Sequence, residues 1–501
     1  MNIDNVTLNG RDYKFHNLEA NNNSITTIIV GENASGKSEL LREIVGAIIR
    51  AKLGNKEHQS PYVDILDEHL SDSYKHNIRQ SIKDVDINVN INDVNNSKSS
   101  FHYHSYSSKR TVTNYKGEKL TLSDGVFRNR FNTDIENTIA FSPNIIAISS
   151  TSYDKFPRLK ENRIMSDSFY ACFTSHQIDY SSFETDTNNI RNSNYNLNYQ
   201  VSNFCESLFL SISKDRIESI KSVFYWLSFS SEFRVFYSFK NKINQLKKDN
   251  LSSKKEKDAL SFYLSKTSKS DVPFIESIDS TREMDFELTH LSRDSINLIE
   301  LSKLDCVTFH NIEFINHNSQ NKMMLSTLSS GQLSLIYGLI GLLSRIEDNS
   351  LIFIDEPEVS LHPKWQEVVL NKYKEIIDLF NKCHLIVATH SPQVASSLNC
   401  DNSFVLRMKD SKIISCSELR NRSVDFQLAD VFEAPSFSNE YISTELVKVL
   451  TLISKNGEID KELRNRITKL KSYRRHLQDK DPLHKMYKLL NSLEERLSDS
   501  E

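Results

Sequence analysis

The sequence predicts an α/β head with an antiparallel β-lobe, an inserted helical lobe and a C-terminal helical tail. Three observations lead to this fold class. Short apolar segments rich in β-forming residues, such as 25–30 and 351–354, precede polar turns and helix-like stretches. Alternating apolar and polar residues in 82–121 are typical of antiparallel strands with one buried face. From about residue 157, and again beyond 419, apolar residues recur at helical spacing.

The composition suits a folded protein of two or three domains. The chain has 501 residues, 38% of them hydrophobic, and a formal net charge of −4, so nucleic-acid contact would need a local basic patch. Six cysteines occur without a CxxC pair, which favours reduced thiols. The first residues lack a signal-peptide pattern, and the longest apolar stretch, 335–343, is far shorter than the roughly 20 residues that span a bilayer. We therefore expect a soluble, cytoplasmic protein without membrane contact.

A phosphate-binding loop is predicted directly after the first apolar strand. Residues 31–38 read GENASGKS and match GxxxxGK[ST] between a strand and a helix. In this arrangement backbone N–H groups at a helix N-terminus surround phosphate oxygens, Lys37 contacts the β- and γ-phosphates of ATP, and the Ser38 hydroxyl ligates Mg²⁺. The predicted ATP-binding residues of the loop are Asn33, Ala34, Ser35, Gly36, Lys37 and Ser38.

Carboxylates for the same site are predicted after a second apolar strand. The segment 350–363 reads SLIFIDEPEVSLHP, so Asp355 and Glu356 follow four apolar residues. Asp355 is suited to hold Mg²⁺, directly or through water, and Glu356 to polarise the attacking water as a general base. A third strand, 384–390, ends in His390, which taken alone is also compatible with a solvent-capped strand end.

A further motif, LSSGQ at 328–332, is poor material for a helix interior yet opens an apolar run at helical spacing. The order GKS, LSSGQ, strand-DE and strand-His resembles the ATP-binding-cassette ATPases, in the soluble branch shared by SMC, RecF and OLD-type proteins. The resemblance implies a homodimer, paired head to tail, in which this signature binds the γ-phosphate of ATP held by the opposite protomer. It implies contacts in trans from Ser329, Ser330, Gly331 and Gln332, a dimer-seam loop at 360–362, and catalytic roles for Glu356 and His390.

Three positions depart from the family pattern. Ala34 and Ser330 stand where many relatives have glycine. No glutamine follows the strand 144–149, where the Q-loop of the family is expected. The aromatic side chain that stacks on adenine is expected upstream of the phosphate loop, where Tyr13 and Phe15 are candidates that suit the core equally well.

Motif spacing predicts the domain organisation. Lys37 and Asp355 are 318 residues apart, more than a typical domain of about 100–150 residues, although both must meet at one phosphate group. We therefore expect an insertion in a split ATPase head. The expected units are the N-terminal part of the head with the β-lobe (1–156), an inserted mainly helical lobe (157–308), the C-terminal part of the head (309–419) and a helical partner-binding tail (420–501).

No fused nuclease is expected after His390. The remaining 111 residues read as helices, and Asp479 and Asp481, which imitate a DxD metal motif, follow no apolar strand and are expected in a charged loop. Together with the segments 145–156 and 431–443 and the size of the insertion, this arrangement resembles the PtuA-type ATPases of Septu and Septu-containing retron antiphage systems. The resemblance implies an ATPase, which need not turn over rapidly, that controls a separate HNH endonuclease and, in a retron, works beside a reverse transcriptase and its RNA/DNA product.

Two other functions are compatible with these motifs. A RecF- or SMC-like DNA repair ATPase would bind DNA directly through basic stretches such as 240–257 or 461–475, although basic helix faces are commonly just solvated. An ATP-clamped scaffold with little turnover would use the nucleotide to hold two subunits together. The missing Q-loop glutamine keeps this second alternative open.

Overall fold

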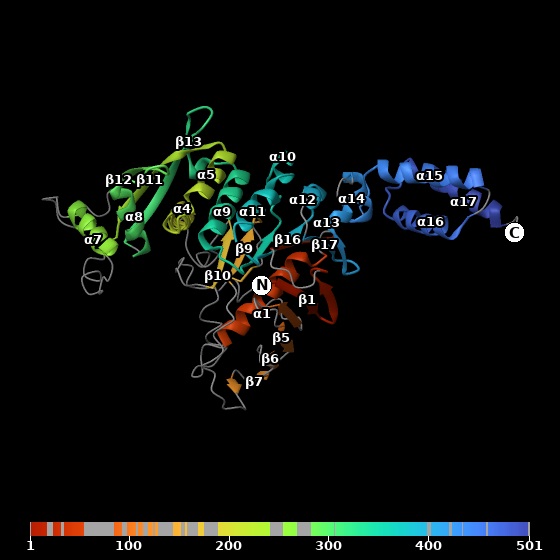
Figure 1. The fold of residues 1–501 in the computed structure, drawn as a ribbon, viewed down its shortest axis with the longest axis horizontal. Helices are drawn as coiled ribbons and strands as arrows, with labels where there is room; N and C mark the ends of the chain where they lie inside the picture. The colour runs from red at the N-terminus through yellow and green to blue at the C-terminus, as the bar shows by residue number, and fades with distance from the viewer. Residues whose placement is uncertain are drawn as a thin grey trace.

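The fold is described from a computed structural model, in which a central head lies between the inserted region at one end and the C-terminal helices at the other (Figure 1). The description covers residues 2–17, 24–31, 35–54, 85–92, 98–106, 109–113, 119–123, 126–128, 144–151, 156–157, 169–174, 189–240, 254–267, 282–304, 306–397, 402–419, 423–432, 434–456 and 459–498.

The head is built on a seven-stranded sheet whose strands come from distant parts of the chain. Their order is β10-β9-β15-β16-β3-β17-β18, and all neighbours are parallel except the final hairpin. The apolar strands predicted from the sequence therefore lie side by side, and their carboxyl ends share one edge. The strands are β3 (Ile25–Val30), β9 (Ile145–Ser149), β10 (Tyr170–Thr174), β15 (Leu351–Asp355), β16 (His384–Thr389), β17 (Ser403–Arg407) and β18 (Lys412–Ser415).

Both faces of this sheet are buried, which explains why its strands are apolar throughout. Along β3, Ile28 and Val30 pack into the core that contains helix α9 (Ser330–Arg345). Ile29 points to the other face, where it packs with helix α1 (Lys37–Gly54). The helices that follow β15 and β16 are α10 (Pro363–Gln366), α11 (Val369–Ile377) and α12 (Pro392–Ser397), and the 3-10 turn η2 (Leu325–Thr327) precedes α9.

The antiparallel β-lobe predicted from alternation is confirmed. Its order is β2-β1-β4-β5-β6-β7-β8. Strand β1 lies between β2 and β4, and from β4 to β8 each strand pairs with the next one in the chain. Ile87, Val89 and Ile91 face the core that this lobe shares with α1. The strands are β1 (Asn2–Leu8), β2 (Arg11–Lys14), β4 (Val85–Asn92), β5 (Lys98–Tyr106), β6 (Lys109–Thr113), β7 (Lys119–Ser123) and β8 (Val126–Arg128).

The inserted region differs from the mainly helical lobe expected at 157–308. It carries a four-stranded antiparallel sheet, ordered β12-β11-β13-β14, besides its helices. Phe233, Val235 and Tyr237 of β11 are buried at alternate positions, as expected of a strand. The mainly helical expectation arose because most of the surrounding region has apolar residues at helical spacing. The elements are α4 (Asn189–Ser213), α5 (Ile217–Trp226), β11 (Phe229–Phe239), α7 (Lys254–Thr267), β12 (Arg282–Glu287), α8 (Arg293–Lys303), β13 (Val307–Asn316) and β14 (Lys322–Met324).

Two of the expected unit boundaries cut across sheets. Strand β10 falls after residue 156, yet it pairs with β9 in the sheet of the head. Strand β13 straddles residue 308 and pairs with both β11 and β14. These strands are positioned by pairing with strands that are distant in the sequence, and the composition of the loops does not indicate that pairing.

The C-terminal helices form a small bundle with its own core. Helices α15 (Glu440–Asn456), α16 (Lys461–Arg474) and α17 (Leu483–Ser498) enclose apolar side chains that are separate from the cores of the head. Helices α13 (Cys416–Leu419) and α14 (Val424–Asp430) connect this bundle to the head (Figure 1). Asp481, expected in a charged loop, is instead buried and accepts hydrogen bonds from the backbone N–H groups of Ser438 and Leu483. None of the described helices is both long and apolar enough to cross a membrane.

Candidate functional site

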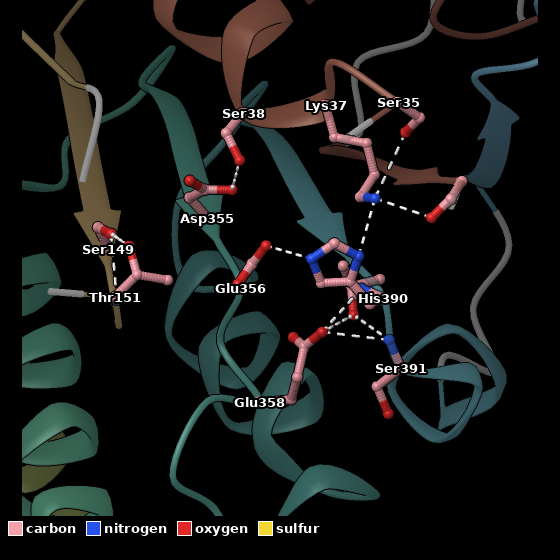
Figure 2. A network of polar contacts seen from close by, with 12 residues as sticks. Ser35, Lys37, Ser38, Ser149, Thr151, Asp355, Glu356, Glu358, His390 and Ser391 are labelled. Carbon is pink, nitrogen blue, oxygen red and sulfur yellow. Dashed lines mark hydrogen bonds and ion pairs between the residues drawn. The ribbon is translucent and has the colours of Figure 1, made fainter. Parts of the chain in front are cut away.

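The carboxyl edge of the parallel sheet gathers side chains from three strands. Strand β3 leads into the loop before α1, β15 ends at Asp355, and β16 ends just before His390. Because β16 lies between β15 and β3, these three chain ends are neighbours. Figure 2 shows Lys37, Ser38, Asp355, Glu356 and His390 converging there. The structure thus brings together five residues that are up to 353 positions apart in the sequence.

Lys37, the first residue of α1, reaches back over the loop that precedes it. Its ammonium donates a hydrogen bond to the Gly31 carbonyl at 2.8 Å and lies 2.9 Å from Nδ1 of His390. The residue is 3% exposed. Burial lowers the pKa of Lys37, and the negative charges of Glu356 and Asp355 oppose that shift.

The backbone around Lys37 needs its two glycines. Gly36 has φ +91°, in the left-handed region that L side chains rarely adopt. A Cβ on Gly31 would lie 2.8 Å from Oγ of Ser35 and 3.1 Å from Cβ of Met408. The loop therefore packs closely on its own polar side chains and on the hairpin after β17. Asn33 and Ala34 lie outside the described residues.

Ser38 and Asp355 face each other across the site. The Ser38 hydroxyl donates a hydrogen bond to Oδ1 of Asp355 at 3.0 Å, and Asp355 is buried. A hydroxyl and a carboxylate oxygen are ligands that suit Mg²⁺, which typically uses one or two carboxylates together with substrate phosphates. No cluster of three or more His, Cys, Asp or Glu side chains that could hold a metal occurs among the described residues. The residues present fit MgATP.

His390 links Lys37 to Glu356. Its Nδ1 lies beside the Lys37 ammonium, which can only donate, so Nδ1 is the acceptor and the ring proton is on Nε2. That Nε2–H donates to Oε1 of Glu356. Glu356 itself has φ +51°, an uncommon conformation for a non-glycine residue that is concentrated at functional sites. Lys37, His390 and Glu356 therefore form one hydrogen-bonded chain (Figure 2).

Glu358 is a site residue that the motif reasoning missed. It is 8% exposed, and its Oε1 accepts three hydrogen bonds. The donors are the Thr389 hydroxyl at 2.6 Å and the backbone N–H groups of His390 at 2.8 Å and Ser391 at 3.1 Å. Burial raises the pKa of Glu358, and these hydrogen bonds counteract the shift. The sequence feature that could have identified Glu358 is that it is the third carboxylate of DEPE (355–358), two residues beyond Glu356.

The start of α9 has different surroundings. Ser329 is the N-cap, and its side chain and that of Gln332 form a reciprocal capping box. Ser329 and Ser330 are exposed, whereas Gly331 is buried against the turn after β15. A Cβ on Gly331 would lie only 2.6 Å from the carbonyl oxygen of Ser360. The polar side chains of this motif thus bond to each other and face outward, while its glycine is buried.

The seam loop predicted at 360–362 connects these two groups of residues. Ser360 has φ +63°, Leu361 is buried, and His362 caps the N-terminus of α10. Gln366 donates to the Leu361 carbonyl at 3.2 Å and contacts the Ser391 hydroxyl at 3.0 Å. The loop is therefore tied to the segment that carries His390.

Two further expectations concern the nucleotide surroundings. After β9, Ser149 and Thr151 contact each other through their hydroxyls at 3.1 Å, at the position where the Q-loop was sought. Tyr13 and Phe15, the adenine-stacking candidates, are both buried in the core that contains α1. Phe15 packs edge-on against His384, and the Arg11 guanidinium lies over the Tyr13 ring. Of the two alternatives left open for these aromatics, the structure therefore favours a core role.

Comparison with known proteins gives concordant matches. The family model described as "AAA ATPase domain" matches residues 1–395. The chain is 26% identical to the Septu protein PtuA of Bacillus thuringiensis over 212 residues, which cover 38% of this chain and 51% of that protein. It is 22% identical over 173 residues to the retron Vc95 probable ATPase of Vibrio cholerae serotype O1 biovar El Tor, covering 33% of each. The chain thus spans about half, or less, of the length of these relatives. The SMC head domain from Thermotoga maritima matches 83% of this chain and 99% of its own, with 11% identity and a TM-score of 0.30.

Proposed function

The chain belongs to the AAA ATPase domain family, and we propose that it is the ATP-hydrolysing subunit of an antiphage defence complex. In this proposal two protomers pair head to tail around ATP and control a separate nuclease. The observation that carries it is the hydrogen-bonded chain from Lys37 through His390 to Glu356, directly beside the Ser38–Asp355 pair.

Nucleotide binding is assigned to the start of α1. Its backbone N–H groups and the buried Lys37 ammonium hold phosphate oxygens, because both present positive charge at one point. Ser38 and Asp355 hold Mg²⁺ with their oxygen atoms. When bound, MgATP supplies the scissile phosphoanhydride bond and a cation that neutralises charge on the phosphates.

Hydrolysis is assigned to Glu356 and His390. The Glu356 carboxylate orients the attacking water and accepts its proton. His390 keeps a donor on Nε2 and an acceptor on Nδ1, so its ring can hold Glu356 on one side while it remains in contact with Lys37 on the other. The ring also lies beside Lys37, near the phosphate oxygens that this lysine holds in the proposal.

Dimerisation is supported by the exposure of Ser329 and Ser330. These hydroxyls begin a helix whose N-terminus favours negative charge, and the first turn of that helix carries no acidic residue. A second protomer that brings bound ATP to this surface satisfies them, together with Gly331 and Gln332. Each protomer then completes the site of the other.

The partner assignment is supported by the likeness to a Septu protein and a retron ATPase. We propose that the partner is a separate HNH endonuclease, and in a retron setting also a reverse transcriptase with its RNA/DNA product. The bundle α15–α17 is the proposed docking element because it has its own core and lies at one end of the molecule (Figure 1).

The test begins with ATP turnover by the purified chain and its Glu356→Gln variant. We expect turnover to fall about 10²- to 10⁴-fold, because the general base is lost, while ATP affinity is retained. Light scattering should then show an accumulated dimer when ATP is present. Glu367→Gln, an exposed carboxylate on α10's C-terminal side, is the matched control. A variant that turns over ATP at the parental rate would remove Glu356 from this role.

Partner control is tested by co-purification of this chain with the HNH endonuclease proposed as its partner. Deletion of 440–501 should release the nuclease and leave ATP binding by the head intact. Two results would point to the other functions. Salt-sensitive DNA binding by the chain alone would indicate a repair ATPase, and ATP-dependent dimerisation without turnover would indicate a scaffold.

A further inference from the structure

Glu358 lies in the turn after β15 and contacts the end of β16, so it connects the two strands whose ends carry Glu356 and His390. We propose that Glu358 is a positioning residue, which holds the segment 389–391 so that the His390 ring stays between Lys37 and Glu356. The expected effect on kcat rests on the proposed ATPase function, whereas the expected effect on the His390 tautomer does not. Glu358 touches neither nucleotide nor reacting atoms in this role.

The contacts of Glu358 are directed at the backbone that carries His390. One carboxylate oxygen accepts from the Thr389 hydroxyl and from the N–H groups of His390 and Ser391, so three consecutive residues share one acceptor. Hydrogen bonds to an ionised acceptor are shorter and about twice as strong as neutral ones. Because the His390 N–H is among them, Glu358 is bonded directly to the residue that carries the imidazole side chain.

If position 358 only filled space, an apolar side chain would cost less free energy to bury than a carboxylate. Glu358 is buried, and its second oxygen, Oε2, is among the buried atoms with no hydrogen-bond partner in the described part of the chain. A buried carboxylate without full solvation is unfavourable relative to an apolar side chain. The free energy lost in burying it is offset only in part by its three hydrogen bonds, which all serve the His390 segment.

The same turn also contacts the signature helix. Ser360, two residues beyond Glu358, presses its carbonyl oxygen against Gly331. Gln366 forms a second bridge, between the Leu361 carbonyl and the Ser391 hydroxyl. This second bridge ends on side-chain and loop atoms and leaves the N–H of His390 to Glu358 alone among its described contacts. Gln366→Ala is therefore a matched control, since it cuts a link between the same two segments without touching the backbone of His390.

The experiment measures the His390 tautomer and the kinetics on the full-length chain. In histidine-labelled protein, ¹H–¹⁵N spectra report which ring nitrogen carries the proton, and His390→Asn identifies the resonance. We expect the Nε2–H form in the parent, a mixture of tautomers in Glu358→Ala, and the Nε2–H form again in Glu358→Gln, whose amide oxygen still accepts. Gln366→Ala should keep the parental spectrum.

In turnover assays, Glu358→Ala should lower kcat about 10- to 100-fold, as expected for loss of hydrogen bonds to a charged group. Its KM should change by less than about threefold, because phosphate contacts remain. Glu358→Gln should recover most of kcat. An unchanged His390 spectrum in Glu358→Ala overturns the proposal, and so does an equal change in Gln366→Ala. Because the spectra are recorded without ATP, they decide the positioning role even if the chain proves to hydrolyse no ATP.

Discussion

Two groups of motif residues have opposite surroundings: the side chains of Lys37, Ser38, Asp355, Glu356, Glu358 and His390, called here the Lys37 pocket (Figure 2), and the start of α9. In the pocket, Lys37, Asp355 and Glu358 are buried. Lys37 and Asp355 bond to residues 353 and 317 positions away in the sequence, and Glu358 bonds to Thr389, 31 positions away. At the start of α9, Ser329 and Gln332 bond only to each other among the described contacts, and both serines are exposed. The pocket is assembled within one chain, whereas the signature motif is formed locally and presents its hydroxyls to the outside.

This difference teaches which residues a single chain can organise by itself. Burial and mutual hydrogen bonding hold the pocket side chains in place, because any buried polar group without a partner is costly. The signature hydroxyls are held only by helix capping, which needs nothing beyond four consecutive residues. Substitutions in the pocket should therefore affect binding within one chain, and substitutions at the signature should affect assembly.

Lys37→Ala should have the largest effect. Removing a buried cation from the phosphate site should weaken ATP binding by about two to three orders of magnitude, because the remaining partners lose their counter-charge. Titration with a fluorescent ATP analogue measures this. Lys14→Ala, an exposed lysine on β2, serves as control. Equal affinity in the Lys37 variant and the parent would contradict the location of the pocket.

Ser329→Arg should separate binding from turnover. We expect ATP affinity of the single chain to stay near the parental value and turnover to fall about tenfold to a hundredfold, because in the proposed dimer the signature acts on the partner's nucleotide. An equimolar mixture with Lys37→Ala should recover about a quarter of parental turnover, since mixed dimers contain one intact site. No recovery on mixing would indicate that both residues act within one chain.

Gly331→Ala should disturb the contact between the signature helix and the turn after β15. The added Cβ would lie 2.6 Å from the Ser360 carbonyl oxygen, so helix or turn must shift. We expect a loss of about 1–3 kcal/mol in the free energy of unfolding, as for other overpacked positions. Thermal unfolding compares it with Ser330→Ala, which is exposed at the adjacent position. A variant as stable as this control would mean that the turn yields without cost.

The smallest effect concerns the pH dependence of stability. Burial raises the pKa of Glu358 above its value in the unfolded chain, so at mildly acidic pH the folded state binds a proton that the unfolded state has released. The stability contributed by Glu358 is therefore present at low pH and declines as pH rises through the raised pKa, with a slope of at most about 1.4 kcal/mol per pH unit. The difference in unfolding free energy between parent and Glu358→Gln, measured across pH 4 to 8, should show this decline. A difference that is independent of pH would argue that the pKa of Glu358 is the same in the folded and unfolded states.

Much of the head could be predicted from local pattern. The strand, loop and helix around 25–54 appear as β3 and α1, and the alternating segments 85–92 and 98–106 appear as paired antiparallel strands. The resemblance to PtuA-type ATPases is likewise confirmed by the match to PtuA, and the family model matches residues 1–395 as an AAA ATPase domain. The sheet of the inserted region was not predicted, because β11 pairs with β12 and β13 across intervals of 45 to 87 residues, which leave no mark on local periodicity.

By itself the sequence determined the chemistry available to this protein: a phosphate loop, two acids after a strand, a strand-end histidine and a capped helix start. Each of these depends on neighbouring residues, and local backbone preferences suffice to form them. Only the tertiary structure decided which groups meet. Parallel pairing of β3, β16 and β15 brings Lys37 to His390 and Glu356, and it aims the carboxylate of Glu358 at the backbone of 389–391. The physical reason is that hydrogen-bond partners of buried groups are selected by the fold, since burial leaves them no water to bind.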